Sequence, residues 1–173
     1  MQLTKSINLI SIRLDVNYGG SSGYGRKYIE RLQGEWGIVD VNDCILAAKT
    51  VASEHQLVDS KRMVIRGGSA GGYTSLAALS IASDNKVFAA ATSLYGISSL
   101  TKLAEFTHKF ESRYLDHLMG GSVREIPEVY EARSPINYAD RIVTPLLVSR
   151  FHFSFFFLTR SDLNLAIATP RRN

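Results

Sequence analysis

The sequence of 173 residues has one cysteine, Cys44, and no apolar run long enough to cross a membrane. A single cysteine excludes an internal disulfide, and its place in an apolar helical pattern indicates a buried, unreactive thiol. The four histidines are not spaced as metal ligands, either with one another or with the cysteine, so we expect no metal site. The longest apolar segment is interrupted by Arg150 and His152 and falls short of the ~20 residues of a spanning helix.

Charge of one sign is not concentrated anywhere, because the formal net charge is only +4 and basic residues are scattered among acidic ones. This pattern favours an ordinary solvated surface over a nucleic-acid-binding patch. The N-terminal segment carries Arg13 within its apolar stretch and has no small-residue cleavage site, which argues against a signal peptide. We therefore expect a cytoplasmic, globular protein with no nucleic-acid or membrane partner; the oligomeric state is left open.

Apolar runs of strand length alternate with helical patterns along most of the chain. Strands are expected at residues 10–18, 62–66, 87–96 and 143–149, helices at 38–52 and 70–82, and a polar, helix-prone section at 101–141. Strands that are apolar on both faces and separated by helices predict a mostly parallel sheet with helices on both faces. Residues 150–173 crowd five phenylalanines together without this pattern. We therefore predict a folded domain over residues 1–149 and a separate tail over 150–173.

The stretch "RGGSAGGYT" places Ser69 between two pairs of glycines, after an expected strand and before an expected helix. It fits G-x-S-x-G, the nucleophile elbow, in which a serine sits on a strained turn above the edge of a sheet. The amide of Ala70 would then point at the oxyanion formed in acyl transfer. The turn needs neighbours without side chains, and the residues that meet this need are Gly67 and Gly71, with Gly68 and Gly72 relaxing crowding further.

A glycine-rich turn between a strand and a helix has two other uses, phosphate binding and a purely structural turn. Neither G-x-G-x-x-G nor G-x-x-x-x-G-K-[ST] can be laid on this stretch, so we expect no phosphate-bearing cofactor. A purely structural turn remains as the alternative to the elbow.

Several motifs in order resemble one family. They are "LDVNYGGSSGYGRKYIERLQGEWGIVDVNDCILAAK", "VDSKRMVIRGGSAGGYTSLAAL", "SLYGISSL", "THKFESRYLDHL" and "RSPINYADRI", which together span about Leu14 to Val148. They resemble the prolyl oligopeptidase family of serine peptidases, in its acylaminoacyl-peptidase and dipeptidyl-aminopeptidase branch. The resemblance implies an α/β-hydrolase catalytic domain, Ser69 as nucleophile, Ala70 as an oxyanion donor, peptide substrates and no cofactor.

The chain departs from this family where the catalytic acid and histidine belong. In the family the acid follows the strand that matches "TPLLV", and the histidine comes later; here "SRFHFSFFF" follows instead. Asp162 lies farther on with no histidine after it, His108 and His117 fall in the polar helical section, and His152 is nearer the acid's position. Asp140 matches a position where a structural role is expected. We therefore expect neither a catalytic acid nor a catalytic histidine.

The family's oxyanion loop belongs upstream of the strand at 10–18, which lies near the start of this chain. Tyr18 follows that strand and is therefore not expected to be the oxyanion tyrosine. The family's β-propeller is also missing. The sequence thus predicts a partial α/β-hydrolase fold without its N-terminal strands and its C-terminal acid/histidine region.

Loss of the base costs about six powers of ten in turnover in a triad enzyme, or roughly 8–9 kcal/mol of barrier. We therefore expect impaired peptide hydrolysis or none. The alternative is a non-catalytic hydrolase-like fragment that acts by binding or has no function; a weaker one is an esterase that recruits an existing histidine. The unpatterned residues 150–173 suggest a truncated gene model, a retained intron or a frameshift.

Overall fold

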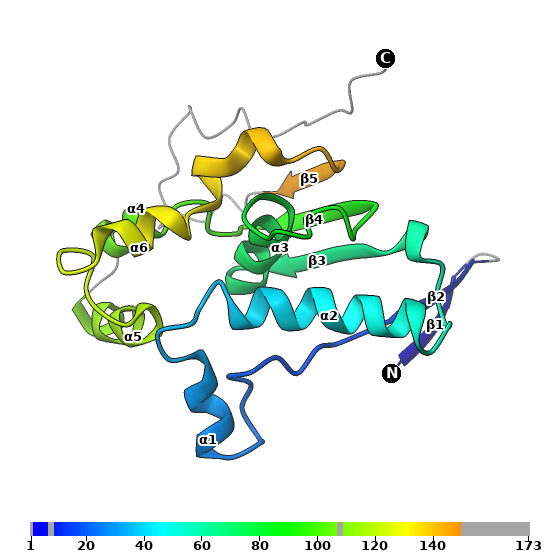
Figure 1. Cartoon of the computed structure of the whole chain (residues 1–173), viewed down its shortest axis with the longest axis horizontal. Coiled ribbons are helices and arrows are strands. Elements are labelled where there is room, and N and C mark those ends of the chain that lie inside the picture. The colour runs from blue at the N-terminus through cyan, green and yellow to red at the C-terminus, as the bar shows by residue number, and fades with distance from the viewer. Residues whose placement is uncertain (1, 7–8, 107–108, 150–173) are drawn as a thin grey trace.

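The computed structural model describes residues 2–6, 9–106 and 109–149. At its centre lies a three-stranded parallel sheet of β3 (Val64–Gly68), β4 (Ala90–Leu94) and β5 (Leu146–Ser149), in the order β3-β4-β5 (Figure 1). These three strands confirm the parallel sheet predicted from apolar runs separated by helices. The expected runs at 62–66, 87–96 and 143–149 each contain or overlap one of them.

The N-terminal strand is found in a different place from the one expected. β1 (Gln2–Ser6) and β2 (Leu9–Arg13) form an antiparallel hairpin that is a sheet of its own. The strand predicted at 10–18 therefore ends at residue 13, and the prediction that it belongs to the parallel sheet is wrong for the described residues. Residues 10–13 alternate apolar and polar side chains, a pattern typical of a hairpin strand rather than of a strand buried on both faces.

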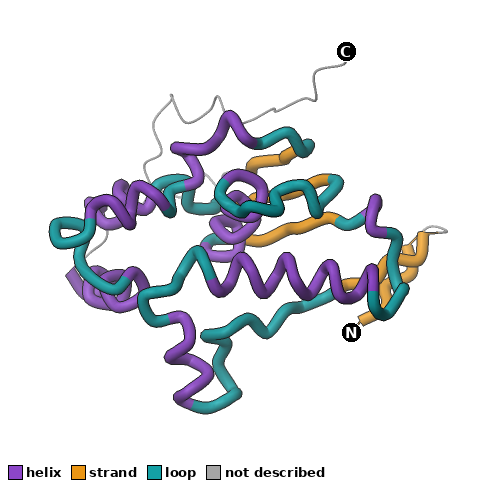
Figure 2. Tube along the Cα trace, in the orientation of Figure 1, coloured by secondary structure: helices purple, strands orange, loops and turns teal. Residues whose placement is uncertain are grey.

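Two helices run beside the parallel sheet, as Figure 2 shows in purple. α2 (Val39–Ser53) and α3 (Ala70–Ser80) fall within one or two residues of the helices predicted at 38–52 and 70–82. α3 contacts both β3 and β4, and α2 packs on α3. Every residue of α3 from Gly72 to Ser80 is buried. α3 is thus the central helix of the domain, and α2 shields it from solvent.

The remaining helices begin and end at the glycine and prolines that predicted breaks in section 101–141. Gly120, with φ of 92°, directly follows the helix that ends at Met119. Pro127 and Pro135 are each the first residue of a later helix. These elements are α4 (Leu100–Phe106), α5 (Lys109–Met119), α6 (Pro127–Ala132) and a 3-10 helix, η3 (Pro135–Arg141). Shorter helical turns are α1 (Arg26–Ile29), η1 (Glu30–Leu32) and η2 (Ser60–Arg62). No helix in the described ranges is long and apolar enough to span a bilayer.

The two faces of the parallel sheet differ in how they are covered. Ile65, Ala91 and Leu146 lie on the face toward α3 and belong to the core or pack against it. On the opposite face, Val64 and Leu147 are 64% and 61% exposed. The sequence pattern predicted helices on both faces, whereas the described residues show one face covered by α3 and the other open at these two positions.

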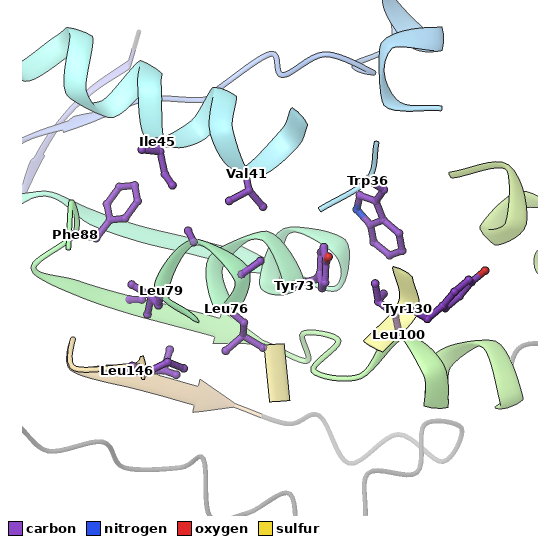
Figure 3. Packing of buried hydrophobic residues seen from close by; sticks show 14 of the residues in the cluster. Trp36, Val41, Ile45, Tyr73, Leu76, Leu79, Phe88, Leu100, Tyr130 and Leu146 are labelled. Carbon is purple, nitrogen blue, oxygen red and sulfur yellow. The ribbon is translucent and has the colours of Figure 1, made fainter. Parts of the chain in front are cut away.

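The core fills the space between the sheet, α2 and α3. Figure 3 shows Val41 and Ile45 pointing from α2 toward α3, whereas Leu76 and Leu79 lie on the side of α3 that faces Leu146 of β5. Aromatic side chains lie at both ends of the cluster. At one end the rings of Trp36 and Tyr73 lie 4.8 Å apart, a distance usual for aromatic pairs in cores. The start of α3 is therefore packed as firmly as its middle.

Two leucines test which face of the sheet stabilises the fold. Leu76→Ala empties a site that is 2% exposed and should lower the free energy of unfolding by about 2–5 kcal/mol. Leu147→Ala, at the open face, should cost about 0.5 kcal/mol or less. Urea unfolding followed by circular dichroism measures both. Equal losses would contradict the one-sided core.

Candidate active site

Ser69 alone forms the turn between β3, which ends at Gly68, and α3, which begins at Ala70. Its φ of 52° and ψ of −118° lie in a region that residues with a side chain rarely adopt. The Ser69 amide donates to the Leu94 carbonyl at 3.0 Å, and the Tyr73 amide donates to the Ser69 carbonyl at 3.0 Å. The strained backbone is thus fixed by the neighbouring strand on one side and by the first turn of α3 on the other.

The glycines around Ser69 are needed for different reasons. A Cβ on Gly67 would lie 2.2 Å from the Gly71 carbonyl oxygen, so the strand and the helix approach too closely for a side chain there. A Cβ on Gly68 would lie 2.7 Å from the Tyr95 hydroxyl, and one on Gly72 would lie 2.6 Å from the Gly96 Cα. By contrast, a Cβ on Gly71 would meet no described atom within 4 Å. The expectation that Gly71 must lack a side chain is therefore wrong, because the free space lies on that side of the turn.

Tyr95 is a residue of the site that the sequence patterns did not single out. It follows β4 as Ser69 follows β3, and its φ of 42° is also in the left-handed region. Because Gly68 pairs with Leu94 in register, Ser69 and Tyr95 lie next to each other at the carboxyl ends of adjacent strands. The Tyr95 side chain is half-exposed. Two strained non-glycine residues at one sheet edge are typical of a functional site, and the dipeptide Tyr95-Gly96 at the end of a strand is the signal that could have revealed it.

The Ser69 side chain is exposed and forms no hydrogen bond with any other described residue. His55 lies just after α2 and is exposed, and His117 lies in the last turn of α5. Among the described residues, neither imidazole forms a hydrogen bond with Ser69. Asp140 is an exposed residue of η3. The sequence candidates His108, His152 and Asp162 fall outside the described residues.

Behind the turn, titratable groups are buried against the core. Burial raises the pKa of the Asp40 carboxyl, although hydrogen bonds from Thr74 and Gly37 act in the opposite direction. Burial, followed by the charges of Asp40 and Asp43, raises the pKa of the Cys44 thiol to about 11. The Cys44 side chain is only partly buried, so the expectation of a buried thiol is wrong, and its lack of reactivity stays a prediction. Among the described residues, no group of three His, Cys, Asp or Glu side chains could hold a metal ion.

Tyr18 is packed against the core rather than beside a free sheet edge. Burial, followed by the charges of Asp40 and Cys44, raises the pKa of its phenol. Tyr18 thus belongs to the surroundings of α2. That it is not an oxyanion tyrosine stays a prediction.

A parallel sheet, a one-residue strand-to-helix turn with a strained serine, and a buried helix after it together define an α/β-hydrolase fold, here in partial form. The fold class predicted from the sequence is confirmed by comparison with solved α/β-hydrolase peptidases. Residues 9–150 match the prolyl oligopeptidase family. The chain belongs to this family.

Relatives and solved structures agree with that assignment. The acylamino-acid-releasing enzyme of Arabidopsis thaliana is 30% identical over 164 residues, which are 90% of this chain and 20% of the relative. The structure of a puromycin-hydrolyzing peptidase of Mycobacterium tuberculosis is 51% identical with a TM-score of 0.72, over 78% of this chain and 20% of that one. The acylaminoacyl peptidase of Pyrococcus horikoshii is 27% identical with a TM-score of 0.68, over 78% and 21%. The chain thus spans about a fifth of the length of the relatives it matches.

A pair of glycine variants tests the geometry of the turn. Gly67→Ala would place a methyl group against the Gly71 carbonyl and should lower the free energy of unfolding by about 1–3 kcal/mol or more. Gly71→Ala should be neutral or stabilise the protein by up to about 1 kcal/mol, because alanine favours a helix over glycine and the site is open. Thermal unfolding of both variants measures the difference. A destabilisation by Gly71→Ala as large as that by Gly67→Ala would show that the turn is packed differently.

Proposed function

We propose that Ser69 is the nucleophile of a serine-type peptidase acting on short or N-acylated peptides. The observation that carries this proposal is the strained, exposed serine on a one-residue turn at the edge of a parallel sheet. The hydroxyl oxygen would bond to the scissile carbonyl carbon, and the carbon–nitrogen bond would break, with the hydroxyl proton passing to the leaving amine. Water would then release the acyl group and restore the serine.

The Ala70 amide is proposed as one donor to the oxyanion of this reaction. It is the first residue of α3, and the peptide between Ser69 and Ala70 is oriented by the bond from the Tyr73 amide to the Ser69 carbonyl. A preorganised amide at the start of a helix suits a developing negative charge. Gly71 adds to this by leaving the space beside the turn free of side-chain atoms.

Membership of the prolyl oligopeptidase family supports a peptide as the substrate class. The relatives are named for releasing acylamino acids and for hydrolysing puromycin, and these are properties of those proteins. Because this chain spans about a fifth of their length, the choice of peptide is part of the proposal. A cytoplasmic location likewise stays a prediction.

We further propose that this chain by itself turns substrate over slowly. No described residue accepts a hydrogen bond from the Ser69 hydroxyl, and in the sequence β5 is followed by Arg150, Phe151 and His152 rather than by the family's carboxylate turn. A serine without a base is a weak nucleophile. The same observation favours, as a second candidate, a non-catalytic hydrolase-like domain that binds peptides.

A fluorophosphonate probe tests the proposed nucleophile. We expect slow labelling of the chain at Ser69 and none in Ser69→Ala, with hydrolysis of a chromogenic peptide close to the uncatalysed rate. Ser22→Ala is the matched control, since Ser22 is an exposed serine in the other glycine-rich turn and should leave labelling unchanged. Circular dichroism verifies that each variant is folded.

The outcomes separate the candidates. Fast labelling at Ser69 together with rapid peptide cleavage would overturn the proposed slow turnover and reveal a working proton acceptor. A folded chain that is never labelled at Ser69 would overturn the nucleophile and favour the binding domain.

A further inference from the structure

A buried carboxyl group lies behind the serine turn and has no role in the chemistry described above. Asp40 is the second residue of α2 and is 1% exposed. In the described residues no cation lies within ion-pair distance of it. An isolated buried carboxylate is costly, so its polar partners decide what it contributes.

The partners of Asp40 connect it to the nucleophile helix. Its Oδ1 accepts a hydrogen bond from the Gly37 amide at 2.7 Å, and its Oδ2 lies 2.7 Å from the Thr74 hydroxyl. That hydroxyl is in turn 3.1 Å from the carbonyl oxygen of Ala70, one helical turn earlier in α3. A continuous path of hydrogen bonds therefore runs from the start of α2 to the residue that follows Ser69. Figure 3 shows the two helices side by side at this end of the core.

A second path fixes the same turn of α3 from the other side. Tyr73 is fully buried, and its hydroxyl donates to the Arg133 carbonyl at 2.9 Å. The Arg133 side chain donates to the carbonyls of Gly34 and Trp36 at 2.9 and 3.0 Å. The loop at 34–37 is thus held by Arg133 at one end and by Asp40 at the other. The Tyr73 amide bonds to the Ser69 carbonyl and the Thr74 hydroxyl bonds to the Ala70 carbonyl, so these two residues contact the peptides on either side of Ala70. The loop at 34–37 and its partners hold both residues in place.

We propose that Asp40 is a positioning residue for the nucleophile turn: through the Thr74 hydroxyl it orients the carbonyl of Ala70 and with it the first turn of α3. This inference rests on the proposed function, because it concerns the turn that presents Ser69 and the Ala70 amide. Asp40 itself touches neither the nucleophile nor a substrate. Its effect is on the direction in which the first peptides of α3 point.

The bonding has two forms, because Thr74 has a single hydroxyl proton to share between two acceptors. When Asp40 is neutral, its carboxyl donates to the Thr74 oxygen and Thr74 donates to the Ala70 carbonyl. When Asp40 is ionised, Thr74 donates to the carboxylate and the Ala70 carbonyl loses that bond. The peptide joining Ala70 and Gly71 therefore senses the charge of Asp40.

The ionisable groups that face this carboxyl come from each element packed around it. They are Cys44 on α2, with Asp43 beside it, Tyr73 on α3 and Tyr18 from the preceding loop, while Arg133 acts on Tyr73 from the other side. Tyr18, Cys44 and Tyr73 all have pKa values raised by burial, so they stay neutral through the acidic range. Asp40 forms a direct hydrogen bond with Thr74, and in the acidic range it is the charge of Asp40 that changes.

Variants at Thr74 test the path by the rate of Ser69 phosphonylation with the fluorophosphonate probe. Thr74→Val keeps the branched shape but removes the hydroxyl, and should slow labelling about tenfold or more, as expected when about 1.4 kcal/mol of transition-state stabilisation is lost. Thr74→Ser retains the hydroxyl and should restore the rate. Ser80→Ala is the matched control, because it removes a fully buried hydroxyl-to-carbonyl bond in the same helix, far from the turn. A wild-type rate in Thr74→Val, or an equal loss in Ser80→Ala, would overturn the proposal.

A second measurement does not depend on reactivity at Ser69. In ¹H–¹⁵N NMR spectra of the whole chain, the amide signals of Ala70 and Gly71 should move as the pH rises through the raised pKa of Asp40. Asp40→Asn should abolish this movement, while Asp43→Asn, which removes a neighbouring charge but leaves an oxygen acceptor for the Gly19 amide, should retain it. Movement that persists in Asp40→Asn would overturn the proposal.

The two readouts separate this inference from the proposed function. A chain that is not labelled at all but shows the Asp40-dependent movement of the Gly71 signal would refute the nucleophile and retain the positioning of the turn. Labelling at Ser69 with Gly71 signals insensitive to Asp40 would do the reverse. If Thr74→Val does not fold, Asp40→Asn, which preserves both an acceptor and a donor, still decides the question by NMR.

Discussion

The close approach of β3 and α3 around Ser69 is the constraint on which the rest of this structure depends. The carbonyl of Gly71 occupies the space that a side chain on Gly67 would need, and the backbones of Gly72 and Gly96 meet in the same way on the other side. Only glycine permits both contacts, so a single residue, Ser69, can separate the strand from the helix. The strain at Ser69 follows from this geometry, and the packing of α3 against the sheet compensates for it.

Stability and function share the first turn of α3. Tyr73 and Thr74 are buried in the core, yet their hydrogen bonds reach the Ser69 and Ala70 carbonyls. Under the proposed function, a core residue would therefore influence how the turn is presented to a substrate. The division between a rigid scaffold and a functional loop, common in other folds, does not apply here, since the serine lies on a turn too short to move independently of its helix.

The sequence predicted the parallel strands, α2 and α3 because each combines a clear apolar pattern with glycine or polar residues at its ends. The turn at Ser69 was predictable because glycines at fixed offsets have one geometric use in that context. The hairpin strand was misplaced because a single alternating segment does not reveal its pairing partner. The places of Tyr95 and Asp40 near the serine turn could not be predicted, because they arise from contacts between elements: Tyr95 through strand register and Asp40 through a threonine thirty-four positions away.

The order of the strands places Ser69 at the end of a border strand of the described sheet. β4 lies between two neighbours, while β3, which leads into Ser69, borders the described sheet with β4 as its one strand partner there. Hydrogen bonds within the sheet therefore restrain β3 from a single side, and helix α3 supplies much of the remaining support. If this border strand frayed, Ser69 would move with it, so a ligand or neighbouring chain that pairs with this edge would also restrain the position of Ser69.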